Sequence, residues 1–419
     1  MTDVMQAFRS AEELSAAAAR LRERALRQQL TPGRAIDSLE RCGAALRGPG
    51  IESLPGVPFL RLWLRRGTLE PIVVRELGRE ALDLNWREDG RTRLRVVPLG
   101  VVGHWPAGNV EIQPLLSLSC SLLAGNAAIV RVPSRLIEVT RTLVEKLWEA
   151  DREGLLRERV IFATFEHTRR DLQEAMAASV DGAMIWGARE AILELRALPF
   201  AHWARVLTFG PRLSVAAMDG ATWGDEVNRQ TWCRRIARDM WQFDQQACSS
   251  PQTLFLERRR DRDVAEFQQA LARAIAEENL AHPRVTIEPA LTSAICLARA
   301  RWLLGGAART AVFPTGPDWT LLAGSGPEIP EPVQGRTLSV LTVDSLFEPI
   351  AGFDGNVQTL GLGVESIELE DALARAAALK GVDRVVKLGQ MHVFGSPWDG
   401  MDLVRPLARM TRHVPIHER

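Results

Sequence analysis

Residues 93–109 read RLRVVPLGVVGHWPAGN, and the fold predicted for the chain follows from this stretch. Its apolar residues predict a β-strand through 93–102 that runs into a loop of small residues. A helix is predicted next, over 112–123, and residues 128–132 form a second apolar strand. A strand, a helix and a strand in this order predict a parallel βαβ unit, which places the chain in the α/β class.

The same alternation continues along most of the 419 residues. Because a chain of this length is too long to fold around a single hydrophobic core, two large domains are expected. We predict domains over 1–203 and 204–390 and a C-terminal tail over 391–419. The Gly- and Pro-rich stretch 315–335 is predicted to be a long surface loop. Outside the first βαβ unit, the predicted helices are 4–30, 35–47, 137–148, 170–177, 189–198, 224–242, 262–280, 290–303 and 369–379, and the predicted strands are 160–163, 183–186, 204–209, 213–217, 253–256, 338–343, 357–362 and 384–388.

Charge and composition argue against several classes of partner. The formal net charge is zero, so nothing in the chain favours binding to nucleic acid or to an anionic membrane surface. The sequence has no apolar run long enough to span a bilayer, and its N-terminus lacks the basic start and apolar core of a signal peptide. We therefore expect a cytoplasmic protein without a membrane span.

The five cysteines are scattered and form no C-x-x-C pair. This pattern argues against disulfides and structural zinc, and no histidine spacing typical of a metal site occurs, so no metal is expected. Cys42 and Cys296 lie in predicted apolar helices and are expected in the core. Cys248 lies in the loop Gln245-Gln246-Ala247-Cys248-Ser249-Ser250-Pro251, before an apolar strand. From this stretch alone, Cys248 is either a nucleophile or a small buried hydrophobe.

A second group of candidate residues follows the strand 128–132. Arg131 and Ser134 come at the carboxyl end of this strand, where α/β sheets open their ligand crevice. A guanidinium and a hydroxyl there can hold a ribose or its phosphate, although an arginine at a strand end is also a common solvated surface charge. The G-x-G-x-x-G fingerprint of dinucleotide sites is absent.

Several motifs in a fixed order resemble the aldehyde dehydrogenase superfamily, and within it the acyl-CoA reductases typified by the fatty acyl-CoA reductase of bacterial bioluminescence. The resemblance covers roughly residues 90–390. It implies an aldehyde dehydrogenase-like fold, with a Rossmann-type NADP-binding domain in 1–203 and an α/β catalytic domain in 204–390. The motifs are P-x-x-N at 106–109, Ala-Gly-Asn at 124–126, Arg-x-Pro-Ser at 131–134, Gln-Gln-Ala-Cys-Ser-Ser-Pro at 245–251 and Trp-Asp-Gly-Met-Asp-Leu at 398–403.

The resemblance also implies a reaction. Cys248 would attack the carbonyl of an acyl-CoA and form an acyl-enzyme. Asn109 and the Cys248 backbone N–H would stabilise the oxyanion, although a loop asparagine can also serve only its own turn. Hydride from NADPH would then give a thiohemiacetal, which collapses to the aldehyde.

Departures from the superfamily pattern refine this prediction. Thr208 replaces the glutamate that activates water in acid-forming members, so hydrolysis of the acyl-enzyme is not expected. Arg135 replaces the acidic residue that binds the adenosine ribose, and together with Arg131 it favours NADPH over NADH.

Two further stretches match cofactor segments of the superfamily. Gly187 and Ala188 open a predicted helix and match its pyrophosphate-binding region. Ser345 stands where the ribose-binding glutamate of the superfamily is expected, while Phe347 of the same segment is retained.

The implied partners are an acyl-CoA or acyl-carrier thioester, an acyl-transferring enzyme as a possible donor, and a second copy of the chain, since the superfamily usually forms homo-oligomers. The tail 395–419 is the segment expected to take part in oligomer formation. Two alternatives remain open at this stage. One is the oxidative direction, from aldehyde to acyl-CoA; the other is a protein that carries an acyl group on Cys248 without reducing it.

Overall fold

The computed structural model describes residues 4–259, 263–284, 287–306 and 308–415. The chain forms two compact units. The first contains the residues up to Pro211 together with the segment from Phe394 onward, and the second is Arg212–Val393. These divisions differ from the predicted boundaries at 203/204 and 390/391, because strand β8 (Arg205–Phe209) pairs with a strand of the first unit and the tail returns to that unit.

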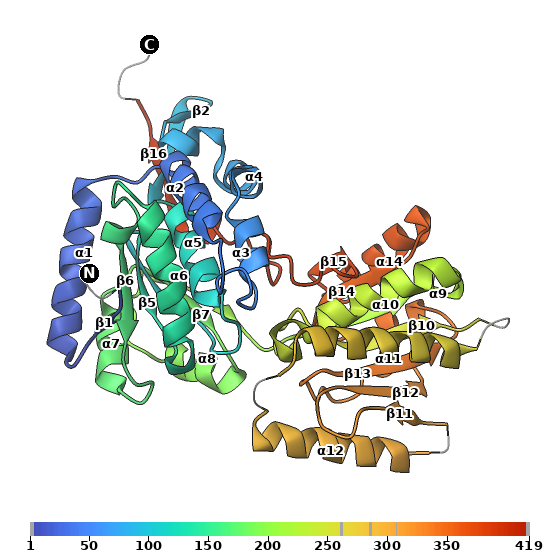
Figure 1. Ribbon diagram of the computed structural model, residues 1–419. Helices are drawn as coiled ribbons and strands as arrows, with labels where there is room; N and C mark the ends of the chain where they lie inside the picture. Colours follow the sequence, from blue (N-terminus) through green and yellow to red (C-terminus); the bar gives the residue numbers. More distant parts are fainter. Residues whose placement is uncertain (1–3, 260–262, 285–286, 307, 416–419) are drawn as a thin grey trace. The chain divides into compact units, whose positions relative to one another are not determined.

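The first unit is built on a parallel sheet with the strand order β1-β6-β5-β4-β7-β8 (Figure 1). The chain runs from β4 outward through β5 and β6, and then returns to the other side of β4 with β7. This reversal between β4 and β7 is the topological switch point at which α/β sheets bind ligands. The strands are β1 (Gln6–Ala7), β4 (Val101–Trp105), β5 (Ala127–Arg131), β6 (Val160–Thr164), β7 (Gly182–Trp186) and β8.

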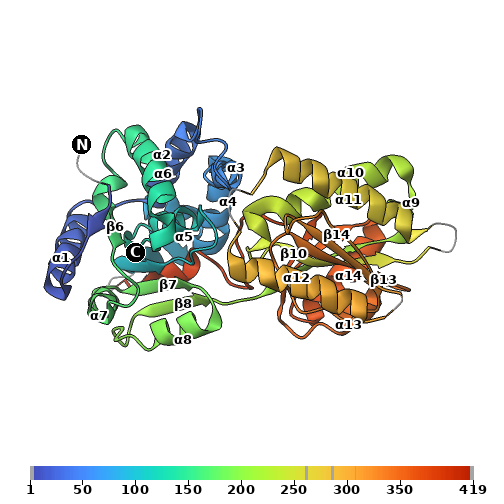
Figure 2. The same ribbon diagram turned by 60° about the horizontal axis from the view of Figure 1, so that its bottom comes forward.

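Helices cover both faces of this sheet (Figure 2). On one face, α1, α7 and α8 bury apolar side chains such as Leu21, Met176 and Ile192 against the strands. α2, α5 and α6 lie over the other face, where the Cys42 thiol of α2 donates to the Leu147 carbonyl of α6. The helices are α1 (Ala11–Arg27), α2 (Pro32–Ala45), α3 (Val57–Trp63), α4 (Arg66–Leu77), α5 (Gln113–Leu123), α6 (Ile137–Ala150), α7 (Arg170–Ala178) and α8 (Arg189–Arg196), with 3-10 turns at Arg79–Asp83, Ser134–Leu136, Arg157–Arg159 and Arg405–Leu407.

The C-terminal segment belongs to the first unit. Its strand β16 (Ala408–His413) pairs with β3 (Thr92–Pro98), which also pairs with β2 (Arg87–Asp89) in a small antiparallel sheet. The buried Glu76 carboxylate on α4 anchors the segment by accepting hydrogen bonds from the Val404 and Arg405 N–H groups at 2.7 and 2.9 Å. Charge-assisted bonds of this kind are among the stronger hydrogen bonds in proteins.

The second unit contains a sheet with the order β11-β12-β13-β10-β9-β14-β15, parallel except for β11. α10 and α11 pack on one face through Trp232, Ile236 and Phe267, while α12, α13 and α14 cover the other (Figure 2). The strands are β9 (Leu213–Met218), β10 (Pro251–Glu257), β11 (Thr310–Val312), β12 (Thr320–Ser325), β13 (Thr337–Val343), β14 (Val357–Gly363) and β15 (Arg384–Lys387). The helices are α9 (Gly220–Gly224), α10 (Glu226–Trp241), α11 (Val264–Ala281), α12 (Pro289–Leu304), α13 (Phe347–Ala351) and α14 (Ile367–Leu379), with a 3-10 turn at Gln242–Gln245.

Three sequence predictions are wrong in detail. The strand predicted over 93–102 is two strands of different sheets, β3 and β4, separated at Gly100, whose φ of 137° breaks the extended path. The predicted loop 315–335 contains β12, which lies between β11 and β13 and is largely buried. Cys296 is exposed on α12 rather than in the core, whereas Cys42 is buried as predicted. In the described part of the chain, no helix is both long and apolar enough to cross a membrane.

Candidate active site

Cys248 lies in the loop between α10 and β10, at the amino end of the sheet of the second unit. Three consecutive residues before it, Phe243, Asp244 and Gln245, have φ values of 54°, 50° and 62°. Residues other than glycine are strained in this left-handed region, at a cost of about 1–2 kcal/mol each. The loop therefore keeps this conformation only because other contacts hold it.

Buried side chains supply those contacts. The Asp244 carboxylate pairs with Arg284 at 3.1 Å and with Arg336 at 2.7 Å, and both arginine side chains are almost fully buried. The Gln245 amide donates to the Pro251 and Thr337 carbonyls at 2.7 and 2.9 Å and accepts from the Thr337 N–H at 2.6 Å. The strained loop is thus fixed to the first residues of β10 and β13.

The thiol of Cys248 is half-buried and has a hydrogen-bond donor. The Gln358 amide at the start of β14 donates to Cys248 Sγ at 3.4 Å, and the Ser214 hydroxyl at the start of β9 donates to the Cys248 carbonyl oxygen at 2.6 Å. A donor to sulfur favours the thiolate over the thiol. The amino ends of three neighbouring strands therefore orient Cys248.

The other cysteines differ from Cys248 in environment. Burial raises the pKa of Cys42 and of Cys233 to about 12, and it also raises the pKa of Cys120. A thiol must ionise to act as a nucleophile, so these three are unsuited to that role near neutral pH. Cys296 is exposed on α12. Of the described cysteines, Cys248 is the one held at a partly exposed position in a structured loop.

A second set of contacts beside Cys248 was not predicted from the sequence. Ser249 Oγ lies 2.9 Å from His392 Nδ1, and His392 Nε2 lies 2.8 Å from the Asp239 carbonyl oxygen. Because a carbonyl only accepts, Nε2 carries the proton and Nδ1 accepts from Ser249. Burial lowers the pKa of His392 to about 4, so this imidazole is neutral near pH 7.

Asp239 completes this set. Its carboxylate accepts a hydrogen bond from the Gly389 N–H at 2.5 Å, and burial raises its pKa to about 7. No local pattern in the sequence identifies Ser249, His392 and Asp239 as a group, because they come from three separate segments.

In the first unit, the predicted residue Asn109 lies in the loop that follows β4. The Gln113 side chain accepts a hydrogen bond from the Ala107 N–H at 2.7 Å and thereby holds this loop against α5. Gly108 allows a close approach, since a Cβ there would come within 3.2 Å of the Arg135 side chain. The structure therefore brings the P-x-x-N loop and the Arg-x-Pro-Ser turn together.

Arg131 is the last residue of β5, and Ser134 and Arg135 follow it at the same edge of the sheet. Arg131 is half-buried beneath Phe165, with its guanidinium carbon 5.7 Å from the ring centroid, and burial lowers its pKa. Its Nε is buried without a hydrogen-bond partner among the described residues. Ser134 and Arg135 are exposed. An unsatisfied buried donor beside exposed polar groups is suited to a ligand that brings an acceptor.

Gly187 and Ala188 join β7 to α8 on the other side of the switch point. Ala188 is the N-cap of α8 and makes no side-chain cap bond, which leaves first-turn N–H groups for a ligand. The preceding Trp186 is buried in the core. It stacks on Phe209 at 3.8 Å and donates to Ser117 Oγ at 3.0 Å.

These observations test whether a dinucleotide cofactor suits the first unit. The loops after β4, β5 and β7 meet at the switch point, where the first-turn N–H groups of α8 can hold a pyrophosphate and Arg131 can hold an anionic or polar group. The residues present fit such a cofactor.

Phe347 is not placed with the other predicted residues. It begins α13 after β13, at the carboxyl end of the sheet, whereas Cys248 lies at the amino end. The structure therefore does not bring Phe347 and Cys248 to the same end of this sheet. The residues of the β13 segment that do reach the Cys248 loop are Arg336 and Thr337, which sequence reasoning missed.

Comparison with solved structures identifies the fold. Lactaldehyde dehydrogenase from Escherichia coli is similar with a TM-score of 0.66 and 14% identity, over 96% of this chain and 90% of that chain. An indole-3-acetaldehyde dehydrogenase solved with NAD+ gives a TM-score of 0.67 and 16% identity, over 96% and 89% of the two chains. These similarities confirm the predicted aldehyde dehydrogenase-like α/β fold.

Sequence comparison identifies the family. A long-chain acyl-protein thioester reductase of Photorhabdus luminescens is 26% identical over 369 residues, which are 84% of this chain and 71% of that protein. The profile of the family described as acyl-CoA reductase (LuxC) matches residues 44–413. The resemblance inferred from motif order is thereby confirmed, and the chain belongs to the acyl-CoA reductase (LuxC) family.

Proposed function

We propose that the chain reduces a long-chain acyl thioester to the aldehyde, with NADPH as the reductant and an acyl-enzyme on Cys248. The observation that carries the proposal is the setting of Cys248. This partly exposed thiol lies in a strained loop, receives a hydrogen bond from Gln358 at 3.4 Å and has its carbonyl fixed by Ser214 at 2.6 Å. Such pre-organisation suits a nucleophile better than a packing residue.

In the first step, the Cys248 thiolate attacks the thioester carbonyl carbon. The new C–S bond forms as the carbonyl becomes a tetrahedral oxyanion, and the oxyanion collapses with loss of the donor thiolate, which takes up a proton. The Asn109 side-chain amide and the Cys248 N–H are the proposed donors to the oxyanion. Removal of one such donor typically costs about 10²–10³ in kcat.

In the second step, the acyl-enzyme is reduced on Cys248. A reduced nicotinamide, when bound, would supply a hydride to the acyl carbon. The product is the oxyanion of a thiohemiacetal on Cys248. As its C–O bond becomes a carbonyl, the C–S bond breaks, and the aldehyde leaves with Cys248 as the free thiolate. For the aldehyde to form, hydride transfer to the acyl-enzyme must be faster than its hydrolysis by water.

Two residues are consistent with slow hydrolysis of the acyl-enzyme. Thr208 has no carboxylate with which to activate water. His392, the imidazole that contacts the Cys248 loop, is bonded at both nitrogens and has a pKa lowered to about 4 by burial. Neither residue is suited to act as a hydrolytic base near neutral pH.

The choice of NADPH rests on charge. Arg131 ends β5 and Arg135 follows it, and Arg135 stands where an acidic residue would bind the adenosine ribose of NADH. A 2′-phosphate would find cationic partners there, and Ser134 adds a hydroxyl. The pyrophosphate is assigned to Gly187, Ala188 and the first turn of α8.

The proposed partners follow from the family. The acyl donor is an acyl-CoA or an acyl-protein thioester, the second being the substrate class named for the Photorhabdus luminescens relative. An acyl-transferring enzyme is proposed as the source of that thioester. We also propose a homo-oligomer, because β16 and β2 form the open edges of the antiparallel sheet and are almost entirely exposed.

Acyl transfer and reduction can be tested separately with myristoyl-CoA, NADPH and two cysteine variants. The wild type should form a covalent myristoyl adduct by intact mass spectrometry and should then oxidise NADPH as aldehyde appears. Cys248→Ala should abolish both, whereas Cys296→Ala, the exposed control, should keep both. NADPH oxidation by Cys248→Ala would exclude the mechanism, and a stable adduct without any NADPH oxidation would identify an acyl carrier instead.

A further inference from the structure

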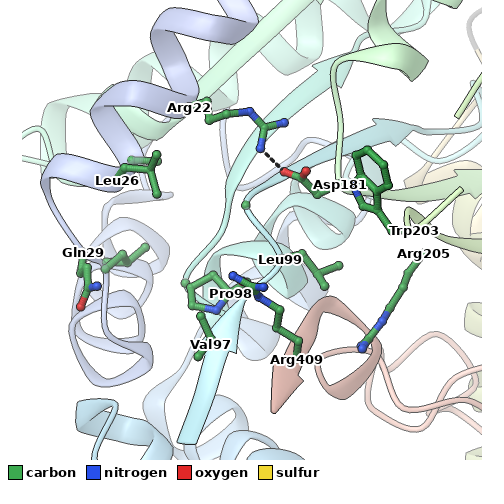
Figure 3. A pocket seen from close by; sticks show the side chains of 14 residues that line it. Arg22, Leu26, Gln29, Val97, Pro98, Leu99, Asp181, Trp203, Arg205 and Arg409 are labelled. Carbon is green, nitrogen blue, oxygen red and sulfur yellow. Dashed lines mark hydrogen bonds and ion pairs between the residues drawn. The ribbon is translucent and has the colours of Figure 1, made fainter. Parts of the chain in front are cut away.

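The first unit carries a pocket of about 530 Å³ at the amino ends of its parallel strands (Figure 3). Gly100 and Asp181 directly precede β4 and β7, and Arg205 begins β8. The proposed cofactor residues all lie at the carboxyl ends of strands of this sheet or follow them. The pocket is therefore separate from the proposed cofactor site, and its volume lies in the range of about 300–1,000 Å³ typical of small-molecule sites.

Apolar side chains form much of the pocket wall. Leu26 on α1 and Trp203 before β8 line it from two sides, although their side chains are 75% and 65% exposed. Val97 and Leu99, at the end of β3 and after it, add a half-buried apolar surface. Large exposed apolar side chains that gather around a concavity are typical of a binding site.

The side chains that line the pocket carry a net positive charge. Asp181 is neutralised by Arg22 at 2.5 Å and also accepts from the Val101 N–H at 2.8 Å. Arg205 and Arg409 have no carboxylate within ion-pair distance among the described residues. Arg205 donates to the Pro406 and Ala408 carbonyls, and Arg409 donates to the Pro98 carbonyl at 3.4 Å.

The two arginines keep donors for a ligand. A guanidinium has five N–H donors, and the bonds of Arg205 and Arg409 within the described chain use only part of them. Their charge is not compensated inside the pocket. Carboxylate, sulfate and phosphate groups are the natural partners of such a group.

We propose that this pocket binds an amphipathic anion, an apolar chain that ends in one carboxylate, sulfate or phosphate group. The chain lies against Leu26 and Trp203, and the anionic group lies between Arg205 and Arg409. Because the pocket joins α1 to β16, the bound ligand holds the N-terminal helix and the C-terminal strand together. This site does not depend on the proposed reductase reaction.

Isothermal titration calorimetry on the full chain can test the site with decanoate, decyl sulfate, decyl phosphate and the neutral 1-decanol. We expect the anions to bind more tightly than 1-decanol, and their ranking identifies the preferred head group. Arg409→Gln should weaken the binding of the preferred anion about tenfold, as expected for the loss of one charge-assisted hydrogen bond. It should leave the binding of 1-decanol unchanged.

A second variant tests the apolar wall without disturbing the fold. Leu26→Glu places a negative charge at an exposed helix position and should weaken anion binding at least tenfold. Leu379→Glu, at an 88% exposed position of α14 in the second unit, is the matched control and should bind as the wild type does.

Three outcomes would overturn the proposal. Equal anion binding by the wild type and both pocket variants would place the ligand elsewhere, for example at the acyl site near Cys248. Binding of 1-decanol as tight as that of the anions would remove the role of the arginines. A change in sedimentation of Leu26→Glu without a change in anion binding would show that this face contacts a second copy of the chain.

Discussion

The two sheets of the molecule present their candidate functional residues at opposite ends of their strands. In the first unit, Asn109, Ser134 and Gly187 follow the carboxyl ends of β4, β5 and β7, as the switch-point rule for α/β sheets requires. In the second unit, Cys248 precedes β10 and is held from the amino ends of β9 and β14. The first arrangement uses loops that follow the strands and helix N–H groups, whereas the second depends on buried side chains that hold a strained loop.

The comparison predicts that the Cys248 loop depends most strongly on the ion pairs of Asp244 with two buried arginines. Asp244→Ala leaves Arg284 and Arg336 buried without their carboxylate, which should destabilise the second unit by about 3–5 kcal/mol. Urea unfolding measures this loss. The rate of covalent acylation of Cys248 should fall as well, because the three left-handed residues lose their support.

The matched control for Asp244 is Asp344, at the carboxyl end of the same sheet. Asp344 pairs with Arg258 at 2.8 Å, but both side chains are more than half exposed. Such a pair contributes about 0–1 kcal/mol, so Asp344→Ala should change little. If Asp244→Ala and Asp344→Ala lowered the free energy of unfolding by similar amounts, the ion pairs at the amino end of this sheet would not be more important for stability than the pair at its carboxyl end.

Two asparagines of the first unit test how its carboxyl-end loops act. Asn109→Ala should slow acylation of Cys248 about 10²–10³-fold with little change in stability, because a half-buried loop amide would be lost from the oxyanion site. Stopped-flow acylation with myristoyl-CoA measures the rate.

Asn126 provides the contrast to Asn109. Its buried amide accepts from the Gly100 N–H at 3.0 Å and donates to the Ser121 and Leu407 carbonyls at 3.2 and 2.9 Å. Asn126→Ala should therefore lower the free energy of unfolding by about 3 kcal/mol, at about 1 kcal/mol per hydrogen bond. If Asn109→Ala lowered stability as Asn126→Ala does and left acylation unchanged, Asn109 would be a structural residue.

The buried groups beside Cys248 also predict two opposite pH dependences. Burial raises the pKa of Asp239 to about 7, so the folded chain keeps a proton that the unfolded chain, with a carboxyl pKa of about 3.9, releases. Stability then falls as pH rises from about 4 to 7. Burial lowers the pKa of His392 to about 4, against about 6.5 when unfolded, so stability rises between about 4 and 6.5.

In the wild type, the contributions of Asp239 and His392 to the pH dependence of stability have opposite signs. Replacing one of the two residues leaves the contribution of the other. Relative to the wild type, Asp239→Asn should become more stable as pH rises through this window, by up to about 1.4 kcal/mol per pH unit. His392→Gln should become less stable over the same range. Urea midpoints at several pH values measure both, and slopes of the same sign would show that the two groups do not titrate as described.

The alternation of helices and strands could be predicted from sequence because each buried parallel strand is a short apolar run between amphipathic helices. The division between β3 and β4 could not. It depends on Gly100, which approaches Asp181 so closely that a Cβ would lie 2.2 Å from the carboxylate oxygen. β12 was missed because its buried run lies inside a Gly- and Pro-rich stretch, where local composition favours a loop.

Residues of the candidate site could be proposed from the sequence only where they lie in short motifs. Cys248 and Asn109 carry recognisable neighbours in a fixed order. Gln358, His392 and Asp239 have none, because each reaches the Cys248 loop or supports it from a distant segment. Phe347 shows the opposite case: its local sequence resembles a cofactor segment, but β13 ends before it at the carboxyl end of the sheet, whereas Cys248 lies at the amino end.

The smallest expected effect tests the carboxyl-end loops of the first unit through Arg135. Arg135→Ser removes an exposed cation beside the proposed 2′-phosphate position, and it should weaken the binding of NADPH and of 2′,5′-ADP about tenfold. NADH affinity should stay the same, because NADH lacks that phosphate.

Arg152→Ser, which removes another exposed arginine of the first unit, is the control. Calorimetry with 2′,5′-ADP reports binding without the reaction. Equal loss of NADPH and NADH affinity would mean that Arg135 supports the loop that contains Gly108 and does not contact the 2′-phosphate. In that case the first unit, like the second, would depend on side chains that hold a loop in place.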